Sequence, residues 1–350
     1  MRDDSSASAP RRRLSGVARV AILIVVLVAV AEAGMRLADA QLETPLRWHE
    51  WEAQVKAGQI EMLADRGGAP IVAVGTSTMH FAFDPVQMRT ELPGAPLAYN
   101  AALPGGIPRI MEIWTDLFVL PELRPKVLVV GVNSTDLNDG GTQGYFYEVF
   151  ADSPEVRRLT GNSNFLEAID HRLSTWSAFW RFRTLIRKPV TFYNSVRGHR
   201  PLNPGDAIKP LGVDVSRRTR IVDASQAKVQ GFIERRQRTW LRNFTVGGAE
   251  AHALRTLVQG ARDRGITVVI VEMPIGDYYV RAHPQGGDDY AKFKQAIATL
   301  VADTGSIFLD ASRSVAPTPD FFADFVHLNG KGAKAFTTYL GRALRERGLA

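Results

Sequence analysis

The sequence predicts an α/β fold in which helices cover both faces of a parallel sheet, with an N-terminal transmembrane helix and a helical insertion. Short apolar runs alternate with segments of helical period, as in a parallel sheet joined by helical crossovers. The run 126–132 is apolar on both faces, which is typical of a strand between two helix layers. Near the N-terminus, 20–31 is apolar throughout and carries no charge.

The predicted elements follow one another in a regular order. Strands are expected at 69–74, 96–99, 126–132, 267–271 and 306–309. Helices are expected at 108–120, 165–187, 229–242, 248–264, 288–303 and 331–347. The last of these helices has apolar residues at helical spacing, so one of its faces should pack on the sheet.

The chain is predicted to comprise a basic cytoplasmic tail (1–16), a transmembrane anchor (17–38), a polar stalk (39–68) and one large domain (69–350). Within that domain, the alternation of strands and helices weakens over about 140–246, which we interpret as an insertion or cap. The three arginines at 11–13 favour an orientation with the tail in the cytoplasm.

The competing interpretation of 17–38 is a cleaved signal peptide, because Ala31-Glu32-Ala33 is a small-x-small site. Both interpretations place the large domain outside the cytoplasm. With an anchor, the protein is a single-pass protein of the cell membrane.

The composition excludes several kinds of site. The chain has no cysteine, which excludes disulfides, cysteine metal sites and a thiol nucleophile. The formal net charge is +7, but the basic residues are scattered and no nucleic-acid-binding motif accompanies them. Attraction to anionic lipid or to acidic envelope polymers is an equally good account of the charge. We therefore expect no nucleic-acid partner, and neither a metal nor another cofactor.

Two segments carry residues suited to nucleophilic catalysis. Ser77 follows the first strand in Gly75-Thr76-Ser77, where a serine can expose its hydroxyl at a helix start or simply cap that helix. Asp324 and His327 lie three residues apart just before the last helix, so an acid can orient an imidazole that acts as a base.

Two further loops after strands can supply donors to a developing oxyanion. Gly105 lies in the loop after the second strand, where its backbone N–H can approach a substrate closely. Asn133 ends the third strand and offers a carboxamide donor. Taken singly, Gly105 can be a turn residue and Asn133 a helix cap.

Together these four segments resemble the SGNH (GDSL-like) hydrolase superfamily over 70–134 and 266–345. The resemblance implies the SGNH/flavodoxin-like fold, with Ser77 as nucleophile, His327 as base and Asp324 as its orienting acid. It further implies an oxyanion hole formed by the N–H groups of Ser77 and Gly105 together with Asn133. An α/β-hydrolase is disfavoured, because Ser77 lacks a glycine two residues later.

Two departures shape the functional prediction: Thr76 stands where the family has an Asp before the serine, and Ser134 where it has an Asp after the asparagine. With both departures, the chain looks more like the divergent membrane-anchored members of the family, which act on cell-envelope polymers. We therefore predict an extracytoplasmic acyl-ester hydrolase or O-acyltransferase that modifies an envelope polysaccharide or a related ester. The expected partners are an acyl-ester or glycan substrate and a membrane-bound acyl donor protein.

The rival hypothesis is a non-catalytic assembly or binding protein of envelope polymer export that keeps the fold.

His80 and the aromatic residues at 176–180 each have two interpretations. His80 can line the acyl pocket or lie on a helix face, and the aromatic residues at 176–180 can contact membrane or glycan, although a core-facing helix is the expectation.

Overall fold

The computed structural model describes residues 15–38, 47–190, 193 and 208–349. They group into two compact units. The N-terminal unit combines 15–38 with the described residues of 164–193, and the sheet domain combines 47–163 with 208–349.

The sheet domain is built on a five-stranded sheet, which confirms the predicted α/β fold with a parallel sheet between helices. The strands are β1 (Ile71–Gly75), β2 (Ala98–Asn100), β3 (Val127–Val132), β6 (Thr267–Glu272) and β7 (Ile307–Asp310). Their order is β2-β1-β3-β6-β7, and every neighbouring pair is parallel. A separate antiparallel pair is formed by β4 (Ile208–Lys209) and β5 (Val213–Asp214).

The sheet is buried on both faces because its strands are apolar at consecutive positions. In β3, Val127 and Val129 point into one hydrophobic core, whereas Leu128 and Val130 point into the other. Successive side chains of a strand face opposite sides of a sheet, so an apolar run supplies both cores at once.

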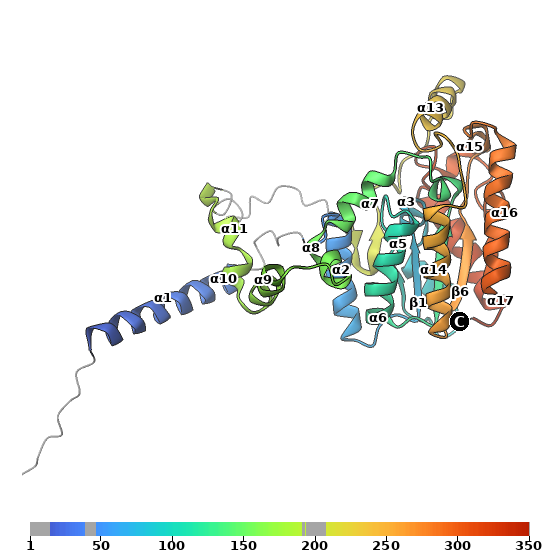
Figure 1. Cartoon of the computed structure of the whole chain (residues 1–350). Helices are drawn as coiled ribbons and strands as arrows, with labels where there is room; N and C mark the ends of the chain where they lie inside the picture. The colour runs from blue at the N-terminus through green and yellow to red at the C-terminus, as the bar shows by residue number, and fades with distance from the viewer. Residues whose placement is uncertain (1–14, 39–46, 191–192, 194–207, 350) are drawn as a thin grey trace, which may run out of the picture. The chain divides into compact units, whose positions relative to one another are not determined.

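Helices cover each face. One core is closed by α3 (Ser77–Ala82), α4 (Pro85–Glu91) and α17 (Gly330–Glu346). The other core is closed by α2 (Trp51–Ala64), α5 (Pro108–Trp114), α6 (Leu120–Leu123), α14 (Ala249–Asp263) and α16 (Gly287–Thr304). In Figure 1, α5 and α14 lie in front of β1 and β6. Shorter helices are α7 (Gly144–Ala151), α8 (Pro154–Leu159), α13 (Gln226–Arg238) and α15 (Asp277–Arg281).

Two segments differ from the sequence-based expectation. The described part of the predicted polar stalk includes α2, whose Ala53, Ala57 and Ile60 are buried in the core of the sheet domain. The single helix expected at 108–120 is α5 followed by a π-helical turn at Thr115–Val119 and then α6. Pro121 lies just beyond that turn, and because proline has no N–H to donate, the i→i−4 ladder widens there.

The predicted insertion is divided between the two units. Its middle part forms α9 (Phe165–Trp176), α10 (Ala178–Arg181) and α11 (Arg183–Ile186), which belong to the N-terminal unit with α1 (Gly16–Ala38). The parts before and after it, including α7 and α13, belong to the sheet domain.

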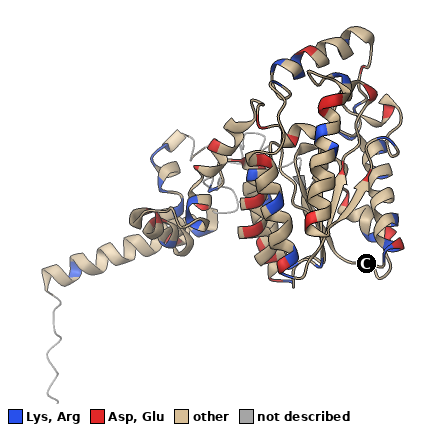
Figure 2. Ribbon diagram, turned by 45° about the vertical axis from the view of Figure 1, so that its right-hand side comes forward, with Lys and Arg blue, Asp and Glu red and all other residues tan. Residues whose placement is uncertain are grey.

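The helix α1 is 23 residues long with a mean hydropathy of 2.4 over its most apolar window, so it is long and apolar enough to cross a membrane. Figure 2 shows few charged residues along it. Near its C-terminal end, the carboxylate of Glu32 accepts hydrogen bonds from Ser177 Oγ and from the N–H groups of Ala178 and Phe179, at 2.7–3.0 Å. Glu32 thereby caps the start of α10.

Candidate functional site

The serine that follows β1 lies at the first turn of α3. Thr76 has extended backbone angles and precedes the helix, so the N–H of Ser77 belongs to the helix start and has no intrahelical acceptor. Gly75 allows this turn to lie close to its neighbours. A Cβ at Gly75 would lie 2.7 Å from Cβ of Met79 and 2.9 Å from the carbonyl oxygen of Gly131.

The hydroxyl of Ser77 is hydrogen-bonded into a chain of three side chains. Its Oγ lies 2.8 Å from Nε2 of His327, and Nδ1 of His327 lies 2.8 Å from Oδ2 of Asp324. Oδ1 of Asp324 accepts the N–H groups of Val326 and His327, both at 3.0 Å. These two backbone bonds fix the carboxylate, so Nδ1 of His327 carries the proton and Nε2 is free to accept one from Ser77.

The charge of Asp324 is held by its neighbours. Burial raises the pKa of this carboxyl, but the hydrogen bond and charge of His327 outweigh burial and hold the pKa well below its usual range. Arg217 adds an ion pair, with Nη1 at 2.6 Å from Oδ2. The guanidinium of Arg217 also stacks over Phe81, whose ring meets that of His327 edge to face. Asp324 is therefore ionised and already paired.

Burial lowers the pKa of His327 below its usual value of 6.5, against the opposing effect of Asp324. A protonated His327 cannot accept the proton of Ser77. We therefore expect kcat/KM for an acyl ester to stay high down to a pH below 6.5 and to fall as His327 becomes protonated under more acidic conditions. A pH profile of kcat/KM, with circular dichroism at each pH to exclude unfolding, tests this expectation. A midpoint above pH 7 for the acidic limb would contradict it.

Gly105 and Asn133 lie at the same edge of the sheet as Ser77. The loop that carries Gly105 is tied to the end of β1, because the N–H of Leu103 donates to the carbonyl oxygen of Gly75 at 3.0 Å. Gly105 has a φ of +70°, and its N–H donates to no described acceptor. The positive φ favours glycine at this position.

Asn133 follows β3, which pairs with β1 up to Gly75 and Gly131. Its backbone N–H donates to Oδ2 of Asp136 at 2.8 Å, and its buried amide oxygen has no hydrogen-bond partner. Burial raises the pKa of Asp136 to about 7. Asn133 donates no side-chain hydrogen bond within the described chain, so its amide N–H is available to an oxyanion.

A cavity of about 360 Å³ opens beside the His327 loop. It is lined by Phe232, Arg235, Arg236, Thr239, Trp240, Asp324, Phe325, Val326 and His327. The α13 helix and the turn after it thus supply one wall, and the loop that carries Asp324 and His327 supplies the other. Sequence reasoning missed these residues of α13, because nothing in their spacing pointed to a site.

A second buried polar cluster lies behind the serine. Lys56 of α2 is fully buried, and its Nζ donates to the carbonyl oxygens of Asn100 and Ala102, both at 2.7 Å. The same Nζ lies 3.1 Å from Nδ1 of His80, and Nε2 of His80 lies 3.1 Å from Oδ2 of Asp214. The sequence-based alternative that His80 lines the acyl pocket is therefore wrong.

The pKa shifts define the charges of this cluster. Burial lowers the pKa of His80 to about 4, so the imidazole is neutral, with Nε2–H donating to Asp214 and Nδ1 accepting from Lys56. Burial also lowers the pKa of Lys56 to about 7, against the attraction of Asp214. Nζ of Lys56 lies within hydrogen-bond distance of three acceptors, and these contacts join the serine helix α3 to the loop leading to Gly105.

Replacing Lys56 with methionine is expected to lower the free energy of unfolding by about 3 kcal/mol, since breaking a buried ionic network leaves its remaining members uncompensated. Urea unfolding followed by circular dichroism measures the change. The exposed Lys126, replaced in the same way, is the matched control. A loss in Lys56→Met no larger than about 0.5 kcal/mol, the range of ordinary surface substitutions, would contradict the expectation.

Two other polar residues that end or follow strands of the sheet, Asn138 and Asp310, also have structural partners. The carboxamide of Asn138 bonds the carbonyl oxygens of Trp240 and Arg242, and Asp310 pairs with Lys294. Within the described ranges, no group of three or more His, Asp or Glu residues is arranged to hold a metal ion.

No protein-family model matches this chain, and no curated protein sequence matches it. Solved structures with similar coordinates include a putative acylhydrolase from Bacteroides fragilis, at 8% identity and a TM-score of 0.41 over 84% of this chain and 97% of that one. A putative arylesterase from Agrobacterium tumefaciens matches at 13% identity and a TM-score of 0.35, over 79% of this chain and 98% of that one. The inhibitor-bound aryl esterase of M. smegmatis matches at 10% identity and a TM-score of 0.38, over 79% of this chain and 98% of that one.

These TM-scores and identities are too low to assign a family or an activity. The functional conclusion below therefore depends on the geometry of the site.

Proposed function

We propose that this protein is a serine-dependent acyl-ester enzyme of the SGNH type. The observation that carries the proposal is the continuous hydrogen-bonded chain from Ser77 through His327 to Asp324, with a free N–H at the serine and at Gly105. A serine, a base and an orienting acid in this geometry are suited to acyl transfer.

In the proposed reaction, Oγ of Ser77 attacks the carbonyl carbon of an ester while Nε2 of His327 takes the hydroxyl proton. The resulting oxyanion is bound by the N–H groups of Ser77 and Gly105 and by the amide of Asn133. His327 then returns its proton to the leaving alcohol, and the acyl group stays on Ser77. A second hydroxyl, activated by His327 in the same way, takes the acyl group and frees the serine.

The second hydroxyl decides whether the protein is an esterase or an O-acyltransferase. Water as acceptor gives hydrolysis, and a glycan hydroxyl gives transfer. We favour a glycan of the cell envelope, since the cavity beside His327 is walled by Trp240 and Phe325, and aromatic faces suit the apolar faces of sugar rings.

We also propose that α1 anchors the protein in the cell membrane, with the sheet domain outside the cytoplasm. At about 1.5 Å per residue, α1 is roughly as long as the hydrocarbon core is thick. Cleavage at Ala31-Glu32-Ala33 would separate α1 and Glu32 from α10, the helix that Glu32 caps, which favours an anchor over a cleaved signal peptide. N-terminal sequencing of the membrane-bound protein tests this, because a mature terminus at residue 34 would exclude the anchor.

Helices α9 and α10 provide further support for the anchor. Trp176 is 81% exposed, Phe179 41% and Trp180 37%, so the expectation that these aromatic residues face a core is wrong. Exposed aromatic residues interspersed with arginines are typical of segments that lie in a membrane interface.

The test of the proposed activity uses the full-length protein in detergent. We expect hydrolysis of 4-nitrophenyl acetate and a mass increase of one acetyl group on the peptide that contains Ser77. Adding an envelope glycan should shorten the lifetime of the adduct if the glycan is the acceptor. Wild-type protein that neither turns over a range of activated esters nor forms an adduct would favour the non-catalytic assembly protein instead.

A further inference from the structure

The guanidinium of Arg236 is the feature of the cavity that the proposed acyl transfer does not use. Arg236 lies on α13 and lines the same cavity as His327. Its Nη1 is completely buried and has no hydrogen-bond partner. Among the described residues, no carboxylate forms an ion pair with it and no group forms a side-chain hydrogen bond with it.

Other half-buried arginines of the sheet domain are paired. Arg109 meets Glu250 at 2.7 Å, and Arg218 meets Asp84 at 2.6 Å. Removing a guanidinium from water without an anionic partner is costly, and the cost is repaid when an anion binds. An unpaired arginine in a cavity beside a nucleophile therefore indicates a ligand that carries the missing charge.

The nearest acidic groups cannot supply that charge. Asp324 lies within electrostatic range of Arg236, but it is already bound by Arg217 and His327. Asp136 also lies within electrostatic range, but burial raises its pKa to about 7, and its Oδ2 already accepts the N–H of Asn133. Arg235 adds a second cation to the cavity wall. The cavity is therefore left with an excess of positive charge.

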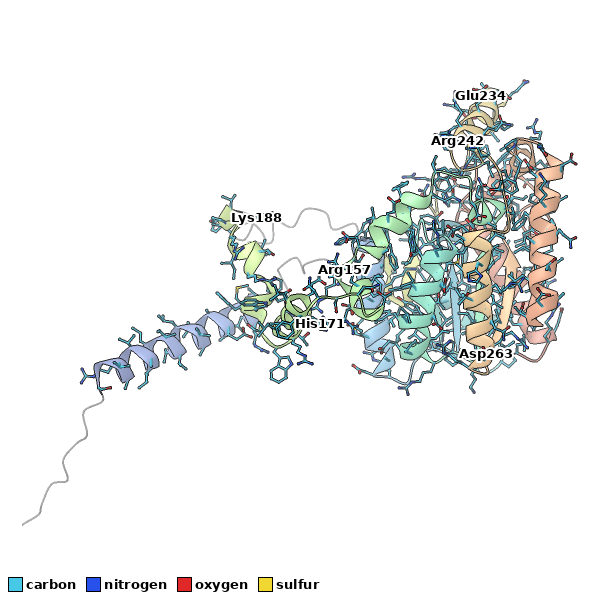
Figure 3. All side chains as sticks on the ribbon, viewed as in Figure 1. Arg157, His171, Lys188, Glu234, Arg242 and Asp263 are labelled. Carbon is cyan, nitrogen blue, oxygen red and sulfur yellow. The ribbon has the colours of Figure 1, made fainter. Side chains whose placement is uncertain are left out.

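The position of Arg236 is fixed by its surroundings. Its Cζ lies 4.3 Å from the ring centre of Trp240 and 5.4 Å from that of Phe232. Phe232 in turn stacks on Phe325 of the His327 loop, with ring centres 4.9 Å apart. The exposed Glu234 of the same helix points away from the body of the domain in Figure 3. The guanidinium is thus held between aromatic rings beside the base.

From these observations we infer that Arg236 forms an anion subsite, which binds a carboxylate or phosphate group on the ester substrate or on the acceptor. This inference rests on the proposed acyl-ester function and narrows its substrate class to acidic esters or acidic glycans. The planar fork of a guanidinium matches both carboxylate and phosphate oxygens.

The first experiment compares uncharged esters with related esters that carry an added anionic group, with full-length protein in detergent. Comparing kcat/KM for phenyl hemisuccinate with kcat/KM for phenyl butyrate tests whether an anionic group is preferred on the acyl side of the ester. On the alcohol side, phenyl acetate is compared with 4-acetoxybenzoate and 4-acetoxyphenyl phosphate, which distinguish carboxylate from phosphate. We expect kcat/KM to favour at least one anionic ester by about 10-fold or more, as charge-assisted hydrogen bonds provide.

In Arg236→Gln, the ratio of kcat/KM for that anionic ester to kcat/KM for its neutral partner should fall by about 10-fold or more. Arg236→Lys keeps the charge without the fork and should retain part of the preference. Arg238→Gln is the matched control, because Arg238 is exposed on the same helix. An unchanged ratio in Arg236→Gln, or no preference for any anionic ester in the wild type, would overturn the inference.

A binding measurement separates this inference from the proposed activity. Calorimetry with benzoate and with phenyl phosphate, on Ser77→Ala protein, needs no turnover. Binding that is lost on adding Arg236→Gln supports the anion subsite even if no ester is turned over. Equal binding with and without Arg236, or no binding of either probe, overturns it even if the serine chemistry is confirmed.

Discussion

Replacing Ser77 with alanine is expected to lower the turnover of acyl esters by about 10⁴-fold or more and to abolish the acyl adduct. The reason is that Oγ of Ser77, the proposed nucleophile, lies 2.8 Å from Nε2 of His327, the proposed base, and alanine has no hydroxyl to replace it. Steady-state rates with 4-nitrophenyl acetate and intact mass spectrometry measure the two effects.

The control for this variant is Ser225→Ala, which removes an exposed hydroxyl that makes no capping bond. Full turnover by Ser77→Ala would exclude the serine mechanism, even if the wild-type protein is an active esterase. Binding of substrate should persist in Ser77→Ala, because the cavity walls do not depend on the serine hydroxyl.

Asp324→Asn is expected to lower kcat by about 10³- to 10⁴-fold while leaving the fold intact. The backbone N–H groups of Val326 and His327 donate to Oδ1, so they will hold the carbonyl oxygen of the new amide at that position. Its NH₂ group must then face Nδ1 of His327. This forces the proton of the imidazole onto Nε2, where it blocks proton transfer from Ser77.

Asp320→Asn is the matched control, since Asp320 is an exposed carboxylate of the same loop that pairs with Lys331. Its rate should change less than about twofold, as for most exposed ion pairs. A rate for Asp324→Asn within about tenfold of the wild type would show that Asp324 does not orient the base. Circular dichroism of both variants checks that neither has unfolded.

The strands of the sheet were predictable because their signal is local. An apolar run such as 126–132 supplies side chains to the cores on both faces of the sheet, and this does not depend on distant parts of the sequence. The observed β3 begins and ends within one residue of the prediction. The break in the helix expected at 108–120 was harder to predict. The apolar period continues through it, and only the missing N–H of Pro121 interrupts the ladder.

The residues at strand ends were predictable for a related reason. In a parallel sheet, the carboxyl ends of neighbouring strands meet at one edge, and ligands bind where the strand order reverses. Here the order reverses between β1 and β3, because β2 lies on one side of β1 and β3 on the other. Ser77 follows β1, Gly105 lies in the loop after β2, and Asn133 follows β3. Asp324 and His327 are only three residues apart in the sequence, so the contact between their side chains is also local.

Contacts between segments distant in sequence were not predictable. Lys56 was assigned to a polar stalk, because a lysine carries no local sign of burial. Its acceptors lie on the loop after β2 and on α3. Arg217 and Arg236 were assigned to an insertion, and their roles depend on which carboxylates the fold brings near them.

The sequence by itself determined the alternating strands and helices, the apolar α1 and the order of the four site segments, because each depends on residues near one another in the chain. Only the tertiary structure decided which charges are paired. It gives Asp324 a guanidinium partner and encloses Lys56 among three acceptors, whereas Nη1 of Arg236 has no hydrogen-bond partner among the described residues. The cost of an unpaired charge depends on burial, and burial is a property of the assembled fold.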